Sequence, residues 1–134
     1  MKRILITGAG SYVGESVRKY MLAHGEYQID AVDTMGDAWK AALRPAQGET
    51  DSQYDVVYHV AGIAHVNADP KMEALYYKVN RDLTIEVAMH AKAAGVKQFI
   101  FMSSQIVFHE SQSLKTEVLT KETKVNPNGF YKVV

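Results

Sequence analysis

Residues 4–14 read Ile-Leu-Ile-Thr-Gly-Ala-Gly-Ser-Tyr-Val-Gly, and this stretch decides the fold. Ile4 to Thr7 is a short, largely β-branched apolar run that stops at a glycine, which is typical of a buried strand. Beyond it, apolar residues recur at helical spacing as far as Gly25, where a helix end belongs. We therefore predict a strand, a tight glycine turn and a helix, in that order.

The rest of the chain continues to alternate between strand-like and helix-like runs. Three further strands are predicted, at Tyr27 to Val32, Asp55 to Ala61 and Gln98 to Met102. A long helix is expected between Pro70 and Gly95, because apolar residues repeat along one face of it, at Leu75, Val79, Leu83, Val87 and Ala91. Strands that alternate with helices predict an α/β fold with a parallel sheet and right-handed crossovers.

Two stretches do not follow this alternation. Residues 34–53 are weakly patterned, with Trp39 as their only large apolar anchor, so we expect a short helix or strand inside an irregular excursion. Residues 111–126 are polar and are expected to form a surface loop. Nothing in the sequence resembles a repeat or an interdomain linker, so residues 1–134 are expected to form a single domain.

Composition excludes several classes of function. Fifteen basic and fifteen acidic residues cancel, which argues against a nucleic-acid or membrane-surface partner. The absence of cysteine excludes disulfides, thiolate metal sites and cysteine nucleophiles, and the histidines are too scattered to predict a metal site. No apolar run reaches the length of a membrane span, and the first residues lack the pattern of a signal peptide. We expect a cytoplasmic protein.

The glycine turn suits a bound pyrophosphate. Helix N-terminal amides and the helix dipole attract an anion, and glycines let the backbone approach it. Glycines at positions 8, 10 and 14 are a weak signal alone, but Asp33 follows the last of them by 19 residues, near the spacing of a ribose-binding acid. No basic residue lies in the turn or between Asp33 and Lys40, which favours NAD over NADP. The predicted cofactor contacts here are Gly8, Ser11, Tyr12, Val13, Gly14 and Asp33.

The ordered motifs from Lys2 to Tyr131 resemble the extended short-chain dehydrogenase/reductase family, especially its NAD-dependent epimerases and dehydratases. The family turn is Thr-Gly-x-x-Gly-x-x-Gly, and Ser11 replaces its middle glycine while Gly10 stands one place early. Asp-Val-Val-Tyr-His-Val-Ala-Gly at 55–62 resembles the strand that lines the cofactor cleft. Residues 76–84, 95–104 and 126–131 resemble a helix start, a strand with its serine motif, and the segment carrying the catalytic tyrosine.

This resemblance implies a Rossmann-type doubly wound parallel sheet, truncated before its last strands and the substrate region. It also implies a nucleotide-sugar substrate and transient hydride transfer to bound NAD, as in a nucleotide-sugar epimerase. Ser104 and Tyr131, 27 residues apart, match the catalytic serine and tyrosine. The remaining cofactor contacts that the resemblance implies are Ala61, Gly62, Asn80 and Ser103. His59, between apolar neighbours, is expected to be a hydrogen-bonded core residue instead of a catalytic one.

The family's active-site lysine lies four residues after the tyrosine, one place beyond Val134. Lys132, directly beside Tyr131, would point elsewhere in a helix or strand. We therefore expect an incomplete form of the family that does not turn over a nucleotide sugar by itself. A dehydratase or keto-sugar reductase of the same family, and a non-catalytic NAD-binding module, remain open alternatives.

A second apolar stripe is expected on the outer face of the long helix, formed by Tyr77, Ile85 and Met89. A surface helix with two apolar stripes usually buries both. We therefore predict a homo-oligomer that associates through residues 77–94.

Overall fold

The computed structural model describes residues 1–48, 52–63, 70–103, 120–122 and 124. The predicted catalytic residues Ser104 and Tyr131 lie outside the described residues, as does most of the loop expected at 111–126.

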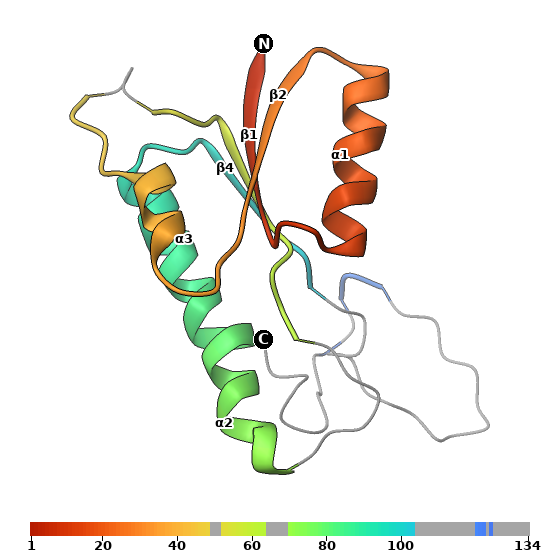
Figure 1. Ribbon diagram of the computed structural model, residues 1–134, viewed down its shortest axis with the longest axis vertical. Helices are drawn as coiled ribbons and strands as arrows, with labels where there is room; N and C mark the ends of the chain where they lie inside the picture. Colours follow the sequence, from red (N-terminus) through yellow and green to blue (C-terminus); the bar gives the residue numbers. More distant parts are fainter. Residues whose placement is uncertain (49–51, 64–69, 104–119, 123, 125–134) are drawn as a thin grey trace.

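Within the described residues, four parallel strands form the sheet, in the order β2-β1-β3-β4 (Figure 1). Their bounds are Lys2–Thr7 for β1, Tyr27–Val32 for β2, Val56–His59 for β3 and Gln98–Phe101 for β4. All four predicted strands are confirmed, as is their parallel arrangement. The chain runs from β1 outward to β2 and then crosses back to β3 on the other side of β1. This reversal makes a switch point at the carboxyl ends of β1 and β3, the place where open α/β sheets bind ligands. The arrangement is the Rossmann-type, doubly wound one that was expected.

Helices cover the two faces of the sheet unequally. The helix α1, Tyr12–His24, lies on one face, and the 3-10 helix η1, Ala38–Leu43, lies with the long helix on the other (Figure 1). Of the short helix or strand expected in residues 34–53, the structure shows a helix, and Trp39 and Leu43 anchor it with about 1% of each residue exposed. At the end of α1, Gly25 has extended backbone, and a Cβ there would collide with the ring of Tyr27.

The long helix is continuous but not uniform. It begins with the 3-10 turn η2, Pro70–Met72, and continues through α2, Glu73–Tyr76, the π-helix η3, Tyr77–Asp82, and α3, Leu83–Ala93. It closes at Gly95, whose φ of 75° suits glycine.

The predicted core face of this helix is correct in α3 and wrong at its start. Val87 and Ala91 are buried, but Leu75 is 44% exposed, and Tyr76 and Asn80 take the buried positions instead. The π-helix explains the difference, because its i→i+5 hydrogen bonds add a residue to the turn and rotate the preceding residues relative to α3.

Alternate residues of the strands point to opposite faces and form two apolar clusters. On the face covered by η1 and α3, Leu5 and Val57 are fully buried against Trp39, Leu43 and the α3 residues. On the α1 face, Ile4, Ile6 and Val56 form a smaller cluster, which partly buried side chains such as Met21 and Tyr58 extend.

Candidate functional site

The glycine turn is fixed to the carboxyl end of β2. The amides of Gly8 and Ala9 both donate to the carbonyl oxygen of Val32, at 2.9 and 3.1 Å. Gly8 and Gly10 adopt φ values of 86° and 79°, a left-handed region that glycine enters without a steric penalty. The turn therefore lies directly beside Asp33, the residue that follows Val32.

Ser11 begins α1 as its N-cap. Its backbone is extended, with φ −69° and ψ 149°, and its Oγ accepts a 3.1 Å hydrogen bond from the amide of Gly14. Serine is among the residues preferred at this position, and so the replacement of the family's middle glycine by Ser11 leaves the helix start well formed. A Cβ at Gly14 would lie 2.6 Å from Ser11 Oγ, which explains the glycine there. Apart from Gly14, whose amide donates to Ser11 Oγ, the first amides of α1 have no backbone acceptor within the helix.

The turns that follow β1 and β3 touch each other at this edge. A Cβ added to Gly8 would lie 3.1 Å from the amide nitrogen of Ala61 and 3.2 Å from its Cα. A Cβ added to Gly62 would lie 3.3 Å from Oδ1 of Asn80. The absence of side chains at Gly8 and Gly62 therefore permits the close approach of these segments at the switch point.

Asn80 holds the backbone beyond β3. Its Oδ1 accepts from the amide of Ile63 at 2.7 Å, and its Nδ2 donates to the carbonyl oxygen of Ile63 at 2.9 Å. Asn80 is 8% exposed and lies in the π-helix η3. Since both ends of its amide are used in this way, Asn80 is placed to support the backbone of the site, and a direct contact with a cofactor stays a prediction.

Thr7 and His59, the last residues of β1 and β3, are fully buried and joined by a hydrogen bond. Thr7 Oγ1 lies 2.7 Å from His59 Nδ1, and His59 Nε2 lies 3.0 Å from Thr84 Oγ1. Burial lowers the pKa of His59 from 6.5 to about 4, so the imidazole is neutral at physiological pH. The expectation of a hydrogen-bonded core histidine is confirmed. The partnership of Thr7 with His59 cannot be predicted from the sequence, because only the parallel register places the two residues opposite each other.

Asp33 is exposed at the end of β2, where its Oδ1 accepts a 2.9 Å hydrogen bond from the amide of Met35. Its other carboxylate oxygen has no hydrogen-bond partner among the described residues. Lys40, the first basic residue after it, pairs with Asp37 at 3.0 Å and with Glu86 at 2.9 Å. The basic side chain nearest to Asp33 in the sequence is therefore already paired with other acidic side chains.

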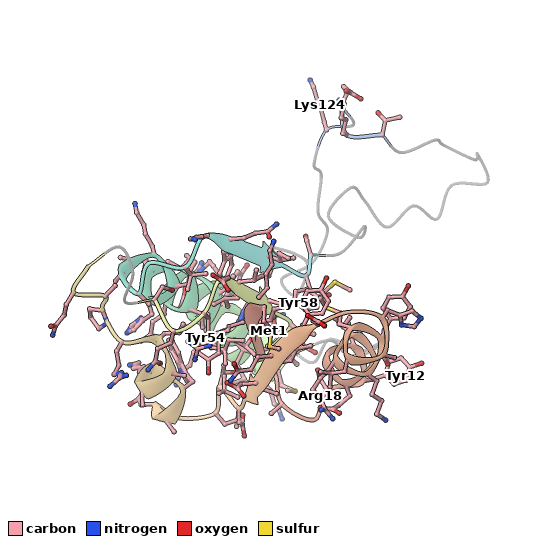
Figure 2. The ribbon with its side chains drawn as sticks, turned by 90° about the horizontal axis from the view of Figure 1, so that it is seen from above. Met1, Tyr12, Arg18, Tyr54, Tyr58 and Lys124 are labelled. Carbon is pink, nitrogen blue, oxygen red and sulfur yellow. The ribbon has the colours of Figure 1, made fainter. Side chains whose placement is uncertain are left out.

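Among the other predicted contacts, Tyr12 projects from the first turn of α1 with 88% of its surface exposed (Figure 2). Val13 beside it is half-buried, and Ser103 is exposed just beyond β4, where its amide donates to the carbonyl oxygen of Phe101 at 3.1 Å. The structure thus brings the predicted cofactor residues to one edge of the sheet.

Among the described residues, no group of three or more His, Asp or Glu side chains could hold a metal ion. In the same part of the chain, no helix has the length and apolar character needed to cross a membrane.

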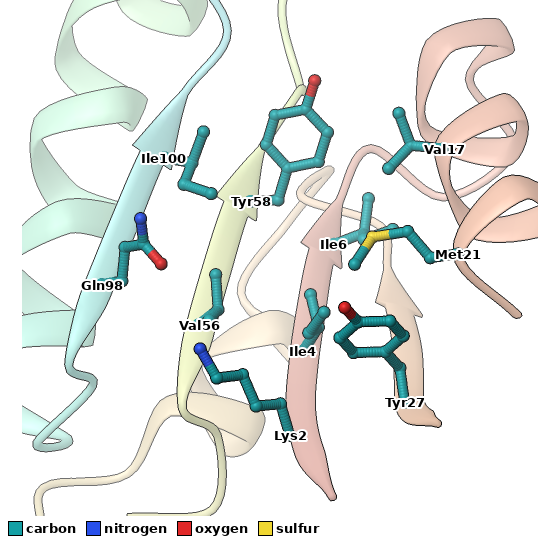
Figure 3. Close-up of a pocket in the computed structure, with 10 residues that line it drawn as sticks. All are labelled: Lys2, Ile4, Ile6, Val17, Met21, Tyr27, Val56, Tyr58, Gln98 and Ile100. Atoms are coloured by element: carbon teal, nitrogen blue, oxygen red, sulfur yellow. The ribbon is translucent and has the colours of Figure 1, made fainter. Parts of the chain in front are cut away.

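A separate apolar cleft of about 350 Å³ lies on the α1 face of the sheet (Figure 3). Val56, Tyr58 and Ile100 line it from β3 and β4, and Val17 and Met21 line it from α1. Lys2, Tyr27 and Gln98 add polar groups to its walls, but the cleft lies on a face of the sheet and not at the switch point, so the polar edge described above is the better candidate site.

Comparisons with known proteins agree with this geometry. The sequence model of the NAD dependent epimerase/dehydratase family matches residues 4–134. A UDP-glucose 4-epimerase from Vibrio cholerae is 32% identical over 114 residues, which cover 77% of this chain and 35% of that protein.

Two solved structures show the same fold. A UDP-glucuronic acid 4-epimerase from Bacillus cereus in complex with NAD is 22% identical, with a TM-score of 0.72 over 98% of this chain and 48% of that one. A dTDP-4-dehydrorhamnose reductase from Clostridium acetobutylicum is 26% identical, with a TM-score of 0.69 over 97% and 45% of the two chains. The chain thus spans between about a third and a half of the length of these relatives. On the family match, which extends from the first strand to the last residue, this chain belongs to the NAD dependent epimerase/dehydratase family.

Proposed function

We propose that this chain binds NAD at the carboxyl edge of the sheet, as the cofactor-binding part of a nucleotide-sugar epimerase. The observation that carries the proposal is the glycine turn, which hydrogen bonds fix beside Asp33 at the switch point. This arrangement brings an anion-binding helix start and a ribose-binding carboxylate to one end of adjacent strands.

The residues present fit a dinucleotide. A Cβ at Gly10 would meet no atom within 4 Å, so the open side of the turn leaves its backbone accessible to a pyrophosphate. The first amides of α1 and the dipole of its 13 residues would stabilise the phosphate charge. The carboxylate oxygen of Asp33 that has no partner in the described part of the chain would accept hydrogen bonds from the adenosine ribose hydroxyls, and the small residues Ala61 and Gly62 would allow the cofactor to pass the end of β3.

Asp33 also supports selectivity for NAD over NADP. A 2′-phosphate would meet the negative charge of Asp33, while Lys40 is held by Asp37 and Glu86. We expect NADP to bind more weakly than NAD for this reason.

The substrate assignment rests on the relatives. The 32% identical relative is named a UDP-glucose 4-epimerase, which favours a nucleotide-sugar substrate here. When bound, NAD would accept a hydride from a sugar carbon and return it. In the proposed reaction, Tyr131 would take the proton from the sugar hydroxyl and Ser104 would hold that hydroxyl in place. A keto-sugar reductase of the same family is the second candidate, favoured by the 26% identical dTDP-4-dehydrorhamnose reductase.

Isothermal titration with NAD tests the binding proposal, with Asp33→Asn as the variant. Asparagine keeps an oxygen for the amide of Met35 but removes the charge, so the change isolates the carboxylate. We expect NAD affinity to fall by about 1.5–3 kcal/mol, the value of a hydrogen bond to a charged group.

Glu26→Gln, at the opposite end of β2, removes the same charge and should leave NAD affinity unchanged. Equal affinities for NAD in the wild type and in Asp33→Asn would show that the ribose assignment is wrong.

Product analysis separates the two substrate candidates. With NAD and UDP-glucose or UDP-galactose, an epimerase interconverts the two sugars, whereas a reductase consumes reduced cofactor on a keto sugar. We expect residues 1–134 alone to bind NAD without turnover, and expect any turnover by a longer polypeptide to require Tyr131. Interconversion that persists in Tyr131→Phe would contradict the assigned base.

A further inference from the structure

A chain of hydrogen bonds runs from the glycine turn through the buried His59 to the long helix. We infer that Thr84, at the helix end of this hydrogen-bond chain, is a positioning residue that sets the spacing between the Gly8 turn and the Ala61 backbone. The inference rests on the proposed function only in taking NAD as the ligand of this edge.

The chain consists of three side chains and one carbonyl group. Thr7 Oγ1 lies 2.7 Å from His59 Nδ1, His59 Nε2 lies 3.0 Å from Thr84 Oγ1, and Thr84 Oγ1 donates to the carbonyl oxygen of Asn80 at 3.1 Å. Thr7 and His59 are 0% exposed. Water therefore does not reach either of them, and each of their polar atoms depends on a partner within the protein.

The directions of these bonds assign the protons. Because Thr84 gives its hydroxyl proton to Asn80, it can only accept from His59, and so the Nε2 of His59 carries the proton. His59 Nδ1 then accepts from the hydroxyl of Thr7. This leaves the lone pairs of Thr7 Oγ1 to accept from the amides of Val60 and Ala61, at 3.2 and 3.4 Å.

This arrangement has a consequence for the cofactor edge. The Ala61 amide that Thr7 holds is the same atom that lies 3.1 Å from the position of a Gly8 Cβ. Thr84 therefore acts on the gap between the two turns through His59 and Thr7, although it touches neither turn in any of the contacts above. Asn80 reinforces the effect, because it accepts from Thr84 with its backbone and holds Ile63 with its side chain.

Removing the Thr84 hydroxyl should reverse the direction of the chain. In Thr84→Val, which has nearly the same shape, His59 Nε2 loses its acceptor, and the neutral imidazole can keep one partner by moving its proton to Nδ1. The Nδ1–H group would then donate to Thr7 Oγ1 and compete with the amides of Val60 and Ala61 for its lone pairs. Thr84→Ser keeps the hydroxyl and should keep the wild-type arrangement.

Three measurements test the inference. Nitrogen-15 NMR of the imidazole should show the Nε2–H tautomer in the wild type and in Thr84→Ser, and the Nδ1–H tautomer in Thr84→Val. Amide exchange at Ala61 should be at least about tenfold faster in Thr84→Val, because its hydrogen bond is weakened. NAD affinity should fall on the order of tenfold in Thr84→Val and be restored in Thr84→Ser, which is a change equivalent to one neutral hydrogen bond.

A destabilised control separates positioning from a general loss of stability. Leu43→Ala opens a cavity under η1 without removing any member of the hydrogen-bond chain, and should leave the His59 tautomer and the NAD affinity of the folded protein unchanged. If Thr84→Val does not fold, Thr84→Ala carries the same test. An unchanged tautomer and unchanged Ala61 exchange in the Thr84 variant would overturn the inference. Absence of NAD binding in the wild type would instead contradict the proposed function, while tautomer and exchange still decide the role of Thr84.

Discussion

The two faces of the sheet are made by the same four strands but are covered very differently. On the closed face, where η1 and α3 pack, Leu5, Val57 and Val87 have no exposed surface and Trp39 has 1%. On the open face, α1 lies over one side of the sheet only, and Figure 3 shows Ile100 of β4 across the cleft from Val17 and Met21 of α1. Ile100 is 39% exposed there, beside the apolar cleft.

The difference shows where stability and function reside in this chain. The closed face contains the larger apolar cluster and also carries Thr7 and His59, which point to the same side as Leu5 and Val57 and connect to α3 through Thr84. The site at the carboxyl edge is thus supported mainly by the closed face. Changes to Thr7, His59 or Thr84 on that face should affect the site, and a change at Ile100 on the open face should affect neither the site nor stability strongly.

The largest effect is expected for Leu5→Ala on the closed face. A fully buried leucine truncated in a packed cluster typically lowers the free energy of unfolding by 2–5 kcal/mol, and we expect about 4 kcal/mol here. Ile100→Ala on the open face should lower it by less than about 1 kcal/mol, since this side chain is already partly in water. Urea unfolding measures both. Equal losses would show that the open face is as well packed as the closed one.

Acid should weaken the closed face through His59. Its pKa is about 4 in the folded protein and 6.5 ordinarily, so between these values the unfolded chain binds a proton that the folded chain does not. The contribution of His59 to the free energy of unfolding is therefore fully present above pH 6.5. It is lost as the pH falls toward 4, by about 3 kcal/mol in total.

Urea unfolding at pH 7, 5.5 and 4.5 measures this loss. The dependence of the free energy of unfolding on pH should become flatter in His59→Gln. It should persist in His24→Gln, which changes an exposed histidine of α1. If the free energy of unfolding depends on pH equally in the wild type and in His59→Gln, His59 does not account for the acid sensitivity.

The outer surface of α3, which points away from the sheet, leaves apolar side chains exposed in a monomer. Ile85 and Met89 lie one helical turn apart and are 53% and 67% exposed, in agreement with two of the three positions expected for a second stripe. We predict that copies of the chain associate through this surface. Met89→Lys should weaken association by about tenfold, equivalent to about 1.4 kcal/mol, measured by sedimentation over a concentration series. Leu22→Lys, which makes the same kind of change at an exposed apolar position of α1, is the control. A wild type that is monomeric at high concentration would contradict the prediction.

The smallest effect is expected where η1 is tied to α3 by charge. Lys40 pairs with Asp37 and Glu86, and these contacts raise the pKa of Lys40, the Glu86 hydrogen bond most of all. Since the pairs are solvent-exposed, Lys40→Gln should lower stability by no more than about 0.5–1 kcal/mol, and added salt should shrink the difference further. A loss close to that of Leu5→Ala would mean that charge pairing, not apolar packing, holds η1 in place.

Local sequence was enough to predict the strands, the glycine turn and their order, because each depends on a short run and the residues that bound it. Tyr27 to Val32 matches β2 at both ends, and Trp39 lies in the short element expected there, although the sequence left open whether that element was a helix or a strand. That the predicted cofactor residues within the described part of the chain lie at one edge also follows from the strand order, since parallel strands bring their carboxyl ends together. The family's motif order then pointed to NAD.

What the sequence could not determine were features that depend on contacts between distant segments. The π-helix η3 is one, because helical periodicity places Leu75 on the core face, whereas packing buries Tyr76 and Asn80 and brings Asn80 to Ile63. The hydrogen-bond chain from Thr7 through His59 to Thr84 is another, because its members are 52 and 25 residues apart and meet only through the strand register and the placement of the long helix. Local propensity sets which elements form, but the tertiary packing decides which buried polar atoms become partners, because each of them must find a partner once water is excluded.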